Sequence, residues 1–286
     1  MSSPSNSVDR RLLREWGLPD PGESKKSRGR VMVVGGSRRT PGALLLAGEA
    51  ALRVGAGRLG LVAPASIEAQ LGIALREAAI FTLPPDATDP LGRTVREELA
   101  SADAVLVGPG FDDAAETRDT LLAVADARVA VLVLDAFAIG ILPDVDRTRL
   151  PSTLILNLNL EEAAILLGRE SGADRAGDLR EIARRFDAVV NCYGIVATPA
   201  GTAWEIGEGG PALGTSGSGD VLAGAIAGFA ARGVEPDRAA VWGSWTHARA
   251  GDRLTARIGI GFLAGDLAPE LSLALGEVLS TPGSGH

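Results

Sequence analysis

Short apolar runs alternate with longer segments of helical periodicity along most of this chain. The short runs are rich in Val, Leu and Ile without polar alternation, which is typical of strands buried on both faces of a sheet. They predict strands at 30–34, 58–62, 79–83, 104–107, 130–134, 153–156, 188–191, 194–198 and 202–206. The longer segments predict helices at 42–54, 67–75, 93–101, 114–126, 161–167, 179–185, 221–232, 238–255 and 267–279.

This alternation predicts an α/β fold with a mainly parallel central sheet and helices on both faces. The last two strand-like runs lie close together, which favours an antiparallel hairpin at the edge of the sheet. Glycine-rich segments at 35–42, 108–110 and 214–219 follow strands. Because ligands bind at the carboxyl ends of parallel strands, we expect these segments to meet at one rim of the sheet.

One domain over residues 25–280 accounts for this pattern, because no stretch inside it has the composition of a linker. The first and last residues of the chain are rich in Ser, Pro and Gly. We therefore expect residues 1–24 to form a flexible N-terminal arm and residues 281–286 to be a disordered tail.

The most informative local sequence is Gly-Thr-Ser-Gly-Ser-Gly-Asp at residues 214–220, which runs directly into an apolar helical segment. Backbone N–H groups at a helix N-terminus have no intrahelical partner, and small residues let an anion approach them. This pattern predicts a phosphate site. The residues that would form it are Ser216, Gly217, Ser218 and Gly219.

Asp220 ends this motif, beside the predicted phosphate site. A carboxylate there is a candidate general base, which takes the proton from a hydroxyl about to receive a phosphoryl group. The alternative is that Asp220 caps the helix and the residues before it form an ordinary turn.

Asp135 follows a strongly apolar strand. It is a candidate for binding Mg²⁺ through water or for orienting a substrate hydroxyl, and a helix cap is the alternative. His247 lies beside an aromatic residue in a predicted helix, a setting in which histidine is more often structural than catalytic. Two histidines and one cysteine leave no plausible zinc site.

Several short blocks resemble the ADP/ATP-dependent NAD(P)H-hydrate dehydratase family, a carbohydrate-kinase-related branch of the ribokinase-like superfamily. The Gly-Ser-Gly-Asp element at 217–220 is similar to the superfamily element that supplies an anion hole and a catalytic aspartate. Further matches, in order, are Gly-Gly-Ser at 35–37, Gly-Ala at 42–43, Val-Gly-Pro-Gly at 107–110, Leu-Asp-Ala at 134–136, Leu-Leu-Gly at 166–168 and Ala-Gly-Asp at 250–252.

The resemblance implies a lyase that repairs hydrated NADH and NADPH with ADP or ATP and Mg²⁺. In that reaction Asp220 takes the proton of the hydroxyl on the hydrated ring, the nucleotide phosphorylates this hydroxyl, and loss of phosphate restores the double bond. The resemblance also implies a homo-oligomer, often a tetramer, and no epimerase domain is expected ahead of the first strand.

The same resemblance suggests roles for further residues. It places Asn191 near the nucleotide beside the phosphate-binding residues. It places Ala43, Gly110 and Asn159 against the substrate, together with Asp220. Glu162 is a second candidate for holding Mg²⁺ through water.

Two positions depart from the family pattern. The family usually carries Thr-Pro-His-Pro-Gly-Glu where residues 157–162 read Asn-Leu-Asn-Leu-Glu-Glu. Asn159 thus replaces the histidine, and Asn191 replaces the lysine of a Lys-Gly pair. An amide forms hydrogen bonds but supplies no positive charge to a phosphate. We expect either a weak dehydratase or a changed substrate, with nucleotide binding retained.

Two other functions compete with this interpretation. A small-molecule kinase for a sugar, a hydroxymethylpyrimidine or a thiazole would use the same anion hole and Asp220, but would stop at the phosphoester. A degenerate member would bind nucleotide without turnover.

Composition narrows the partners. The net charge of −8 argues against a nucleic acid or an acidic membrane surface, and the small-molecule partners are those that the resemblance implies. Cys192 is the one cysteine, so no intrachain disulfide forms. The sequence has no signal peptide and no apolar run of membrane-spanning length, and a cytoplasmic location is expected.

Overall fold

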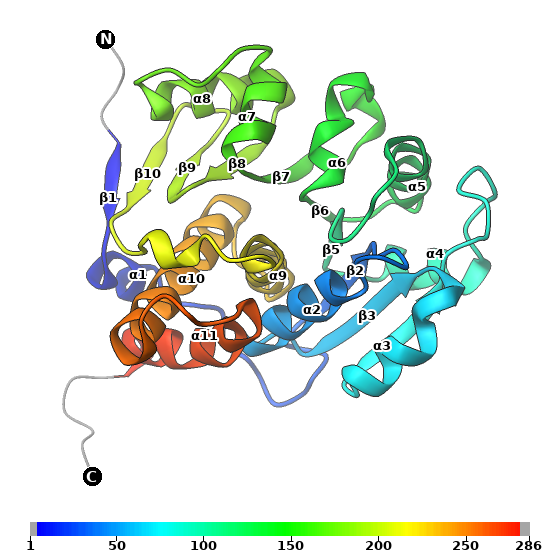
Figure 1. Ribbon diagram of the computed structural model, residues 1–286, viewed down its shortest axis with the longest axis horizontal. Helices are drawn as coiled ribbons and strands as arrows, with labels where there is room; N and C mark the ends of the chain where they lie inside the picture. The colour runs from blue at the N-terminus through cyan, green and yellow to red at the C-terminus, as the bar shows by residue number, and fades with distance from the viewer. Residues whose placement is uncertain (1–4, 281–286) are drawn as a thin grey trace.

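A ten-stranded sheet runs through the middle of the protein (Figure 1). The computed structural model describes residues 5–280. The strands are β1 (Asn6–Val8), β2 (Arg30–Val34), β3 (Arg58–Ala63), β4 (Ala78–Thr82), β5 (Ala104–Val107), β6 (Val131–Leu134), β7 (Thr153–Leu158), β8 (Val189–Cys192), β9 (Ile195–Ala197) and β10 (Ala203–Ile206). Their order is β1-β10-β9-β8-β7-β6-β5-β2-β3-β4, and only the two pairings of β9 are antiparallel. The predicted mainly parallel α/β fold is confirmed.

Helices cover both faces of this sheet. Those on the face that carries most of the aliphatic core are α1 (Arg10–Trp16), α2 (Gly42–Arg53), α3 (Glu68–Ala74), α9 (Ser218–Ala231), α10 (Pro236–Ile258) and α11 (Ala264–Leu279). Those on the other face are α4 (Arg93–Ala100), α5 (Ala114–Asp126), α6 (Phe137–Gly140), α7 (Leu160–Leu167) and α8 (Arg175–Phe186).

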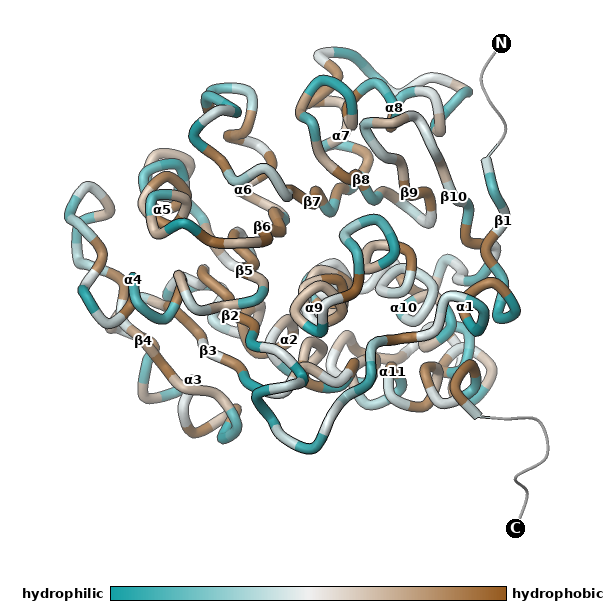
Figure 2. Tube along the Cα trace, turned by 180° about the vertical axis from the view of Figure 1, so that it is seen from behind, coloured by the Kyte–Doolittle hydropathy of each residue, from teal (hydrophilic) through white to brown (hydrophobic). Residues whose placement is uncertain are grey.

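The strands explain why two cores form. In β2, Val31 and Val33 point to one face, whereas Met32 and Val34 point to the other, and all four are fully buried. Figure 2 shows the central strands as hydrophobic over most of their length. Continuous apolar runs are therefore required, because each successive side chain enters one of the two cores.

The sheet has its topological switch point between β2 and β5. The chain proceeds from β2 outward to β4 and then returns to add β5 on the other side of β2. The glycine turns after these two strands meet there, since the N–H of Gly36 donates to the Pro109 carbonyl at 2.8 Å. The expectation that these two glycine segments share a rim is confirmed.

The N-terminal segment differs from the flexible arm predicted for residues 1–24. Strand β1 pairs in parallel with β10, so β1 and not the β9–β10 hairpin forms the outer edge. In α1, the Trp16 ring meets Trp204 edge-on at 6.1 Å between ring centroids. The sequence did not predict β1 and α1, because elements of three and seven residues are too short to show periodicity. Residues 1–4 and the predicted tail at 281–286 lie outside the described residues.

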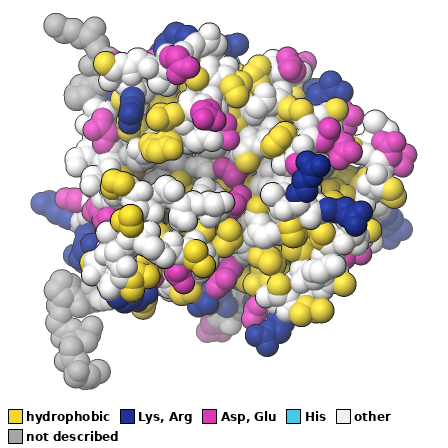
Figure 3. Space-filling view, viewed as in Figure 1, with side chains coloured by type: hydrophobic (Ala, Val, Ile, Leu, Met, Phe, Trp, Pro, Cys, Tyr) yellow, Lys and Arg dark blue, Asp and Glu magenta, His cyan; other side chains and the backbone are white. Residues whose placement is uncertain are grey.

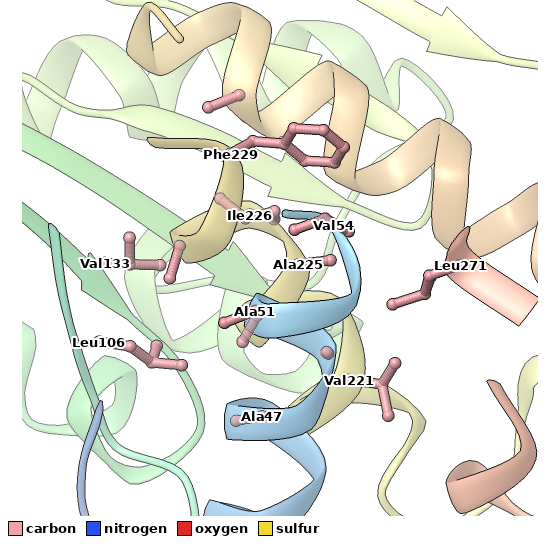
Figure 4. Close-up of a cluster of buried hydrophobic side chains, with 14 of the residues drawn as sticks. Ala47, Ala51, Val54, Leu106, Val133, Val221, Ala225, Ile226, Phe229 and Leu271 are labelled. Atoms are coloured by element: carbon pink, nitrogen blue, oxygen red, sulfur yellow. The ribbon is translucent and has the colours of Figure 1, made fainter. Parts of the chain in front are cut away.

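Helices α2 and α9 pack with their backbones unusually close. A Cβ atom at Gly224 would lie 2.1 Å from the Ala47 carbonyl oxygen, and one at Gly228 would lie 2.8 Å from that of Ala51. Figure 4 shows this seam, with Ala47 and Ala51 of α2 against the α9 side chains around Ala225. Only glycine permits this approach, which places the N-terminus of α9 at the rim of the sheet.

We expect Gly224→Ala to destabilise the protein by about 1–3 kcal/mol, because the added methyl group forces the two helices apart. Thermal unfolding measures this as a melting temperature lower by several degrees. Gly276→Ala is the matched control, since a Cβ atom there meets no atom within 4 Å. That control gains about 1 kcal/mol of helix propensity, and equal behaviour of the two variants would refute the close-packing explanation.

Candidate functional site

A cavity of about 790 Å³ lies where the carboxyl ends of β6 and β7 face the N-terminus of α9. In Figure 1 the yellow segment that leads into α9 lies in the middle of the molecule, opposite β6 and β7. The polar side chains that line the cavity are Asp135, Asn157, Asn159, Glu162, Tyr193, Glu208, Thr215, Ser218, Asp220, Ser244 and His247. Within residues 5–280, this lining includes no lysine or arginine. Acidic side chains also appear in the middle of the face seen in Figure 3.

Helix α9 begins at Ser218 and leaves backbone donors open at its N-terminus. The first i−4 hydrogen bond joins the Val221 N–H to the Gly217 carbonyl at 3.2 Å, and the Ser218 N–H donates to the Thr215 carbonyl at 3.1 Å. Within residues 5–280, the N–H groups of Gly219 and Asp220 have no backbone acceptor. These two donors, at the positive end of the helix dipole, are suited to an anion.

Gly217 and Gly219 occupy this turn for different physical reasons. Gly217 has a φ of +88°, a conformation that favours glycine, and a Cβ atom there would lie 2.5 Å from Leu46 Cδ1, so a side chain would also force Leu46 to shift. A Cβ atom at Gly219 would meet no atom within 4 Å, and this residue lines the cavity. Ser216 is exposed and is not part of the lining, so its predicted phosphate contact stays a prediction.

Asp220 stands in the first turn of α9 rather than before it. The N-cap position belongs to Gly217, and α9 has no side-chain cap. The alternative that Asp220 is a helix cap is therefore wrong. Burial raises the pKa of its carboxyl group to about 6. A carboxylate with this pKa, beside open backbone donors and inside a cavity, is suited to act as a general base near neutral pH.

Asp135 follows β6 and enters the same cavity. Its carbonyl oxygen lies where a side chain at Gly108 would be, only 1.8 Å from the position of a Cβ atom. The next residue, Ala136, has a φ of +51°, a strained conformation for a residue with a side chain. The Asn157 amide donates to Asp135 Oδ1 at 2.7 Å. Burial, and then the negative charges of Asp220 and Glu162, raise the pKa of Asp135 well above its usual range.

Asn159 and Glu162 form a reciprocal cap at the start of α7. The Glu162 N–H donates to Asn159 Oδ1 at 2.8 Å, and the Asn159 N–H donates to Glu162 Oε2 at 2.9 Å. Burial raises the pKa of Glu162 to about 7. Both residues line the cavity, and the substrate contact predicted for Asn159 stays a prediction. The Asn-x-x-Glu spacing was a readable signal of this cap.

The other predicted contacts lie away from the cavity wall. Asn191 is fully buried and lies outside the lining, with its amide bonded to Asn157 and Ser244. Ala43 and Gly110 lie together near the switch point of the sheet, where a Cβ atom at Gly110 would be 3.1 Å from the Ala43 Cβ. The geometry therefore does not support direct contact between Asn191 and a ligand, because the wall of the cavity separates the two.

His247 is buried in α10 and contacts the turn at the start of α9. Its Nε2 and the Ser218 hydroxyl lie 3.0 Å apart, and both residues line the cavity. Burial lowers the pKa of His247 to about 4, so the ring is neutral at physiological pH. The histidine therefore orients the first residue of α9 and adds no positive charge to the cavity.

The carboxylates of the cavity suit Mg²⁺ without forming a complete protein cage. Within residues 5–280, no group of three or more His, Cys, Asp or Glu side chains converges as a metal cluster. Asp135, Glu162 and Asp220 nevertheless line one cavity, and the latter two raise the pKa of Asp135 by their charge. Mg²⁺ is commonly held by one or two carboxylates, water and substrate phosphates, which fits this arrangement.

Four polar lining residues were not singled out from the sequence, namely Asn157, Tyr193, Glu208 and Ser244. Asn157 bonds to Asp135, and its place at a strand end was a usable signal. Tyr193 is 66% exposed with a φ of +45°, in the turn between β8 and β9. Glu208 lies in a glycine-rich segment that gave no separate signal, where Asp252 accepts hydrogen bonds from the Gly209 N–H at 3.1 and 3.2 Å.

Comparison with known proteins places this arrangement in a family. The family model described as NAD(P)H-hydrate dehydratase matches residues 31–272. The chain belongs to this family. It is 42% identical over 269 residues to an ADP-dependent (S)-NAD(P)H-hydrate dehydratase from Xanthomonas campestris, covering 91% of this chain and 92% of that relative.

Other members of the dehydratase family differ in length. The bifunctional NAD(P)H-hydrate repair enzyme of Moorella thermoacetica is 34% identical over 86% of this chain, which spans 49% of that relative. The ADP/ATP-dependent NAD(P)H-hydrate dehydratase of Bacillus subtilis, crystallised with ATP and Mg²⁺, has a TM-score of 0.83 at 23% identity. That alignment covers 96% of this chain and 99% of the Bacillus chain, and it shows a shared ribokinase-like fold. No helix within residues 5–280 is long and apolar enough to cross a membrane.

We expect Asp220→Asn to stabilise the protein at pH 8 and to leave stability unchanged near pH 4. The folded-state pKa, raised from 3.8 to about 6, means that the folded protein holds this proton more tightly than the unfolded chain. The stability contributed by Asp220 is therefore full below about pH 4 and is lost as the pH rises through 6. The asparagine removes this loss, which is on the order of 1–3 kcal/mol at pH 8.

Melting temperatures of both proteins at the two pH values test this prediction. Asp112→Asn, a change of the same kind at an exposed aspartate, is the control for the loss of one negative charge. An Asp220→Asn variant that melts at the wild-type temperature at pH 8 would show that Asp220 is not under strain from burial.

Proposed function

We propose that this protein removes water from hydrated NADH or NADPH in a nucleotide-dependent reaction. The observation that supports this most directly is the position of Asp220. Its carboxyl group, with a pKa of about 6, lies in one cavity with the open N–H groups of α9. A base and an anion-binding helix end side by side are what transfer of a phosphoryl group to a hydroxyl requires.

The residues of the chain divide this work. Asp220 takes the proton from the ring hydroxyl as that oxygen attacks the terminal phosphate of the nucleotide. The N–H groups of Gly219 and Asp220 stabilise the negative charge of the transferring group, and Ser218, held by His247, completes the turn. The nucleotide leaves with one phosphate fewer. Phosphorylation has then converted hydroxide, a poor leaving group, into phosphate, a good one, and loss of phosphate together with a proton from the neighbouring ring carbon restores the ring double bond.

Asp135 and Glu162 are the residues that would hold Mg²⁺, directly or through water. Bound there, the ion would neutralise the phosphate charge that the acidic lining of the cavity otherwise repels. With no lysine or arginine in the described lining, this requirement is stronger than in a cavity with a basic side chain.

Phosphate release tests the function. The protein is mixed with hydrated NADH or hydrated NADPH, Mg²⁺, and either ADP or ATP, and free phosphate and restored NAD(P)H absorbance are followed. Formation of both supports the dehydratase. Accumulation of a phosphorylated substrate without phosphate release would support a kinase instead, and nucleotide binding without either product would support a non-catalytic member.

We expect Asp220→Asn to reduce turnover by about 10²- to 10⁴-fold, the usual contribution of a positioned general base. Asparagine is nearly isosteric, and Asp220 makes no cap whose loss would disturb α9. Steady-state phosphate release measures the effect. A variant that keeps more than about a tenth of wild-type turnover would eliminate the base role.

We expect Gly219→Val to abolish nucleotide binding while the protein still folds. A Cβ atom at this position meets no described atom within 4 Å, and Gly219 lines the cavity, so the added side chain should occupy the space in front of the open N–H groups. Wild-type protein at about 100 times the dissociation constant of Mg-ADP should gain roughly 2.7 kcal/mol of stability, seen as a higher melting temperature. Adenosine is the control ligand without phosphate. An unchanged Mg-ADP shift in Gly219→Val would show that phosphate binds elsewhere.

A further inference from the structure

A chain of three hydrogen bonds runs from α10 to Asp135 along the wall of the cavity. The Ser244 hydroxyl donates to Asn191 Oδ1 at 2.6 Å. The Asn191 amide donates to Asn157 Oδ1 at 2.7 Å, and the Asn157 amide donates to Asp135 Oδ1 at 2.7 Å. All four side chains are buried. We call Ser244, Asn191 and Asn157 the polar relay.

The register of the sheet builds this relay. Asn157 in β7 and Asn191 in β8 are direct partners in the parallel ladder. Asp135 follows β6, which pairs with β7 on its other side. The relay therefore crosses three adjacent strands at their carboxyl ends, and each bond joins neighbouring elements.

The direction of the relay is fixed at the Asp135 end. The Asn157 NH₂ group donates to Asp135 Oδ1, which is the orientation that the carboxylate needs once it is ionised by a bound cation, because an ionised carboxylate only accepts hydrogen bonds. The Asn157 carbonyl oxygen then accepts from Asn191, whose own carbonyl oxygen accepts from the Ser244 hydroxyl. Every donor points towards Asp135, and successive bonds of this kind polarise one another.

Packing alone does not account for these residues. Buried amides and hydroxyls contribute little net stability, and apolar side chains of similar shape at all of these positions would be about neutral or stabilising. The relay also ends on a carboxylate that lines the cavity, rather than inside the core. We therefore attribute the polarity of the relay to its effect on Asp135 in the cavity.

We propose that the polar relay positions the Asp135 carboxylate for its ligand, with Asn191 as a positioning residue that touches no ligand itself. This rests on the proposed function in that the ligand is the Mg-nucleotide. Asn191 is the informative member, because it is 0% exposed and lies outside the lining, whereas Asn157 and Ser244 belong to it. Asn191 acts on Asp135 through Asn157, by hydrogen bonding and without adding charge.

Calorimetric binding of Mg-ADP to the full chain tests the proposal, without the hydrated substrate. The variants are Asp135→Asn, Asn191→Leu and the double variant. We expect each single change to weaken binding about tenfold or more, as for a lost hydrogen bond to a charged group. The double variant should bind no more weakly than Asp135→Asn alone, because Asn191 acts through Asp135.

Asn191→Asp provides a second variant of nearly unchanged shape. A carboxylate at this position has no donor for Asn157 Oδ1, so it favours the opposite orientation of the Asn157 amide and weakens Mg-ADP binding as well. Leu13→Ala is the control for stability, since Leu13 is fully buried in α1, away from the cavity lining. It should lower the melting temperature without changing Mg-ADP affinity.

Three results would overturn the proposal. They are wild-type affinity in a folded Asn191→Leu variant, additive effects in the double variant, and wild-type affinity in Asp135→Asn. The proposed function fails by a different measurement, because it requires turnover of hydrated NADH or NADPH by the wild-type protein.

Discussion

The close contact between α2 and α9 is the constraint on which the site depends. The backbones approach until a Cβ atom at Gly224 would lie 2.1 Å from the Ala47 carbonyl oxygen. This contact holds α9 against the sheet along its length, so that its N-terminus reaches the carboxyl ends of β6 and β7. The open N–H groups of Gly219 and Asp220 are thus presented by a rigid helix rather than by a loop. Preorganised donors of this kind need no rearrangement when charge develops.

The same cavity brings together three carboxyl groups that are buried or partly buried. Burial raises the pKa values of Asp220 and Glu162 to about 6 and about 7, and that of Asp135 rises as well. Each shift is a cost to folding at neutral pH, because ionised carboxyl groups are better solvated in the unfolded chain. A packing role does not explain three such groups together, whereas the proposed proton transfer and Mg²⁺ binding would use them.

The sequence was sufficient for the features that depend on local pattern. Continuous apolar runs identified the strands of the parallel sheet, and the helix predicted to end at residue 232 ends at Ala231, two residues before Gly233 with its φ of +83°. The short elements β1 and α1 were missed, because tertiary contacts such as that between Trp16 and Trp204 hold them in place. The Asp220 side chain could be assigned to the site but not to its position within α9, since the helix begins at Ser218, three residues before the predicted start at residue 221.

The two departures from the family pattern show why residue type alone does not give a role. Asn159 lacks the charge of a protonated histidine, yet its side chain caps α7 together with Glu162. Asn191 lacks the charge of a lysine, yet both ends of its amide are used, one towards Asn157 and one towards Ser244. Both asparagine side chains therefore make hydrogen bonds of their own. A lysine at position 191 would bring a positive charge into a fully buried space that now holds only neutral partners. The neutral amide of Asn191 therefore suits the hydrogen bonds that it makes with Asn157 and Ser244, where a buried lysine would find no charged partner.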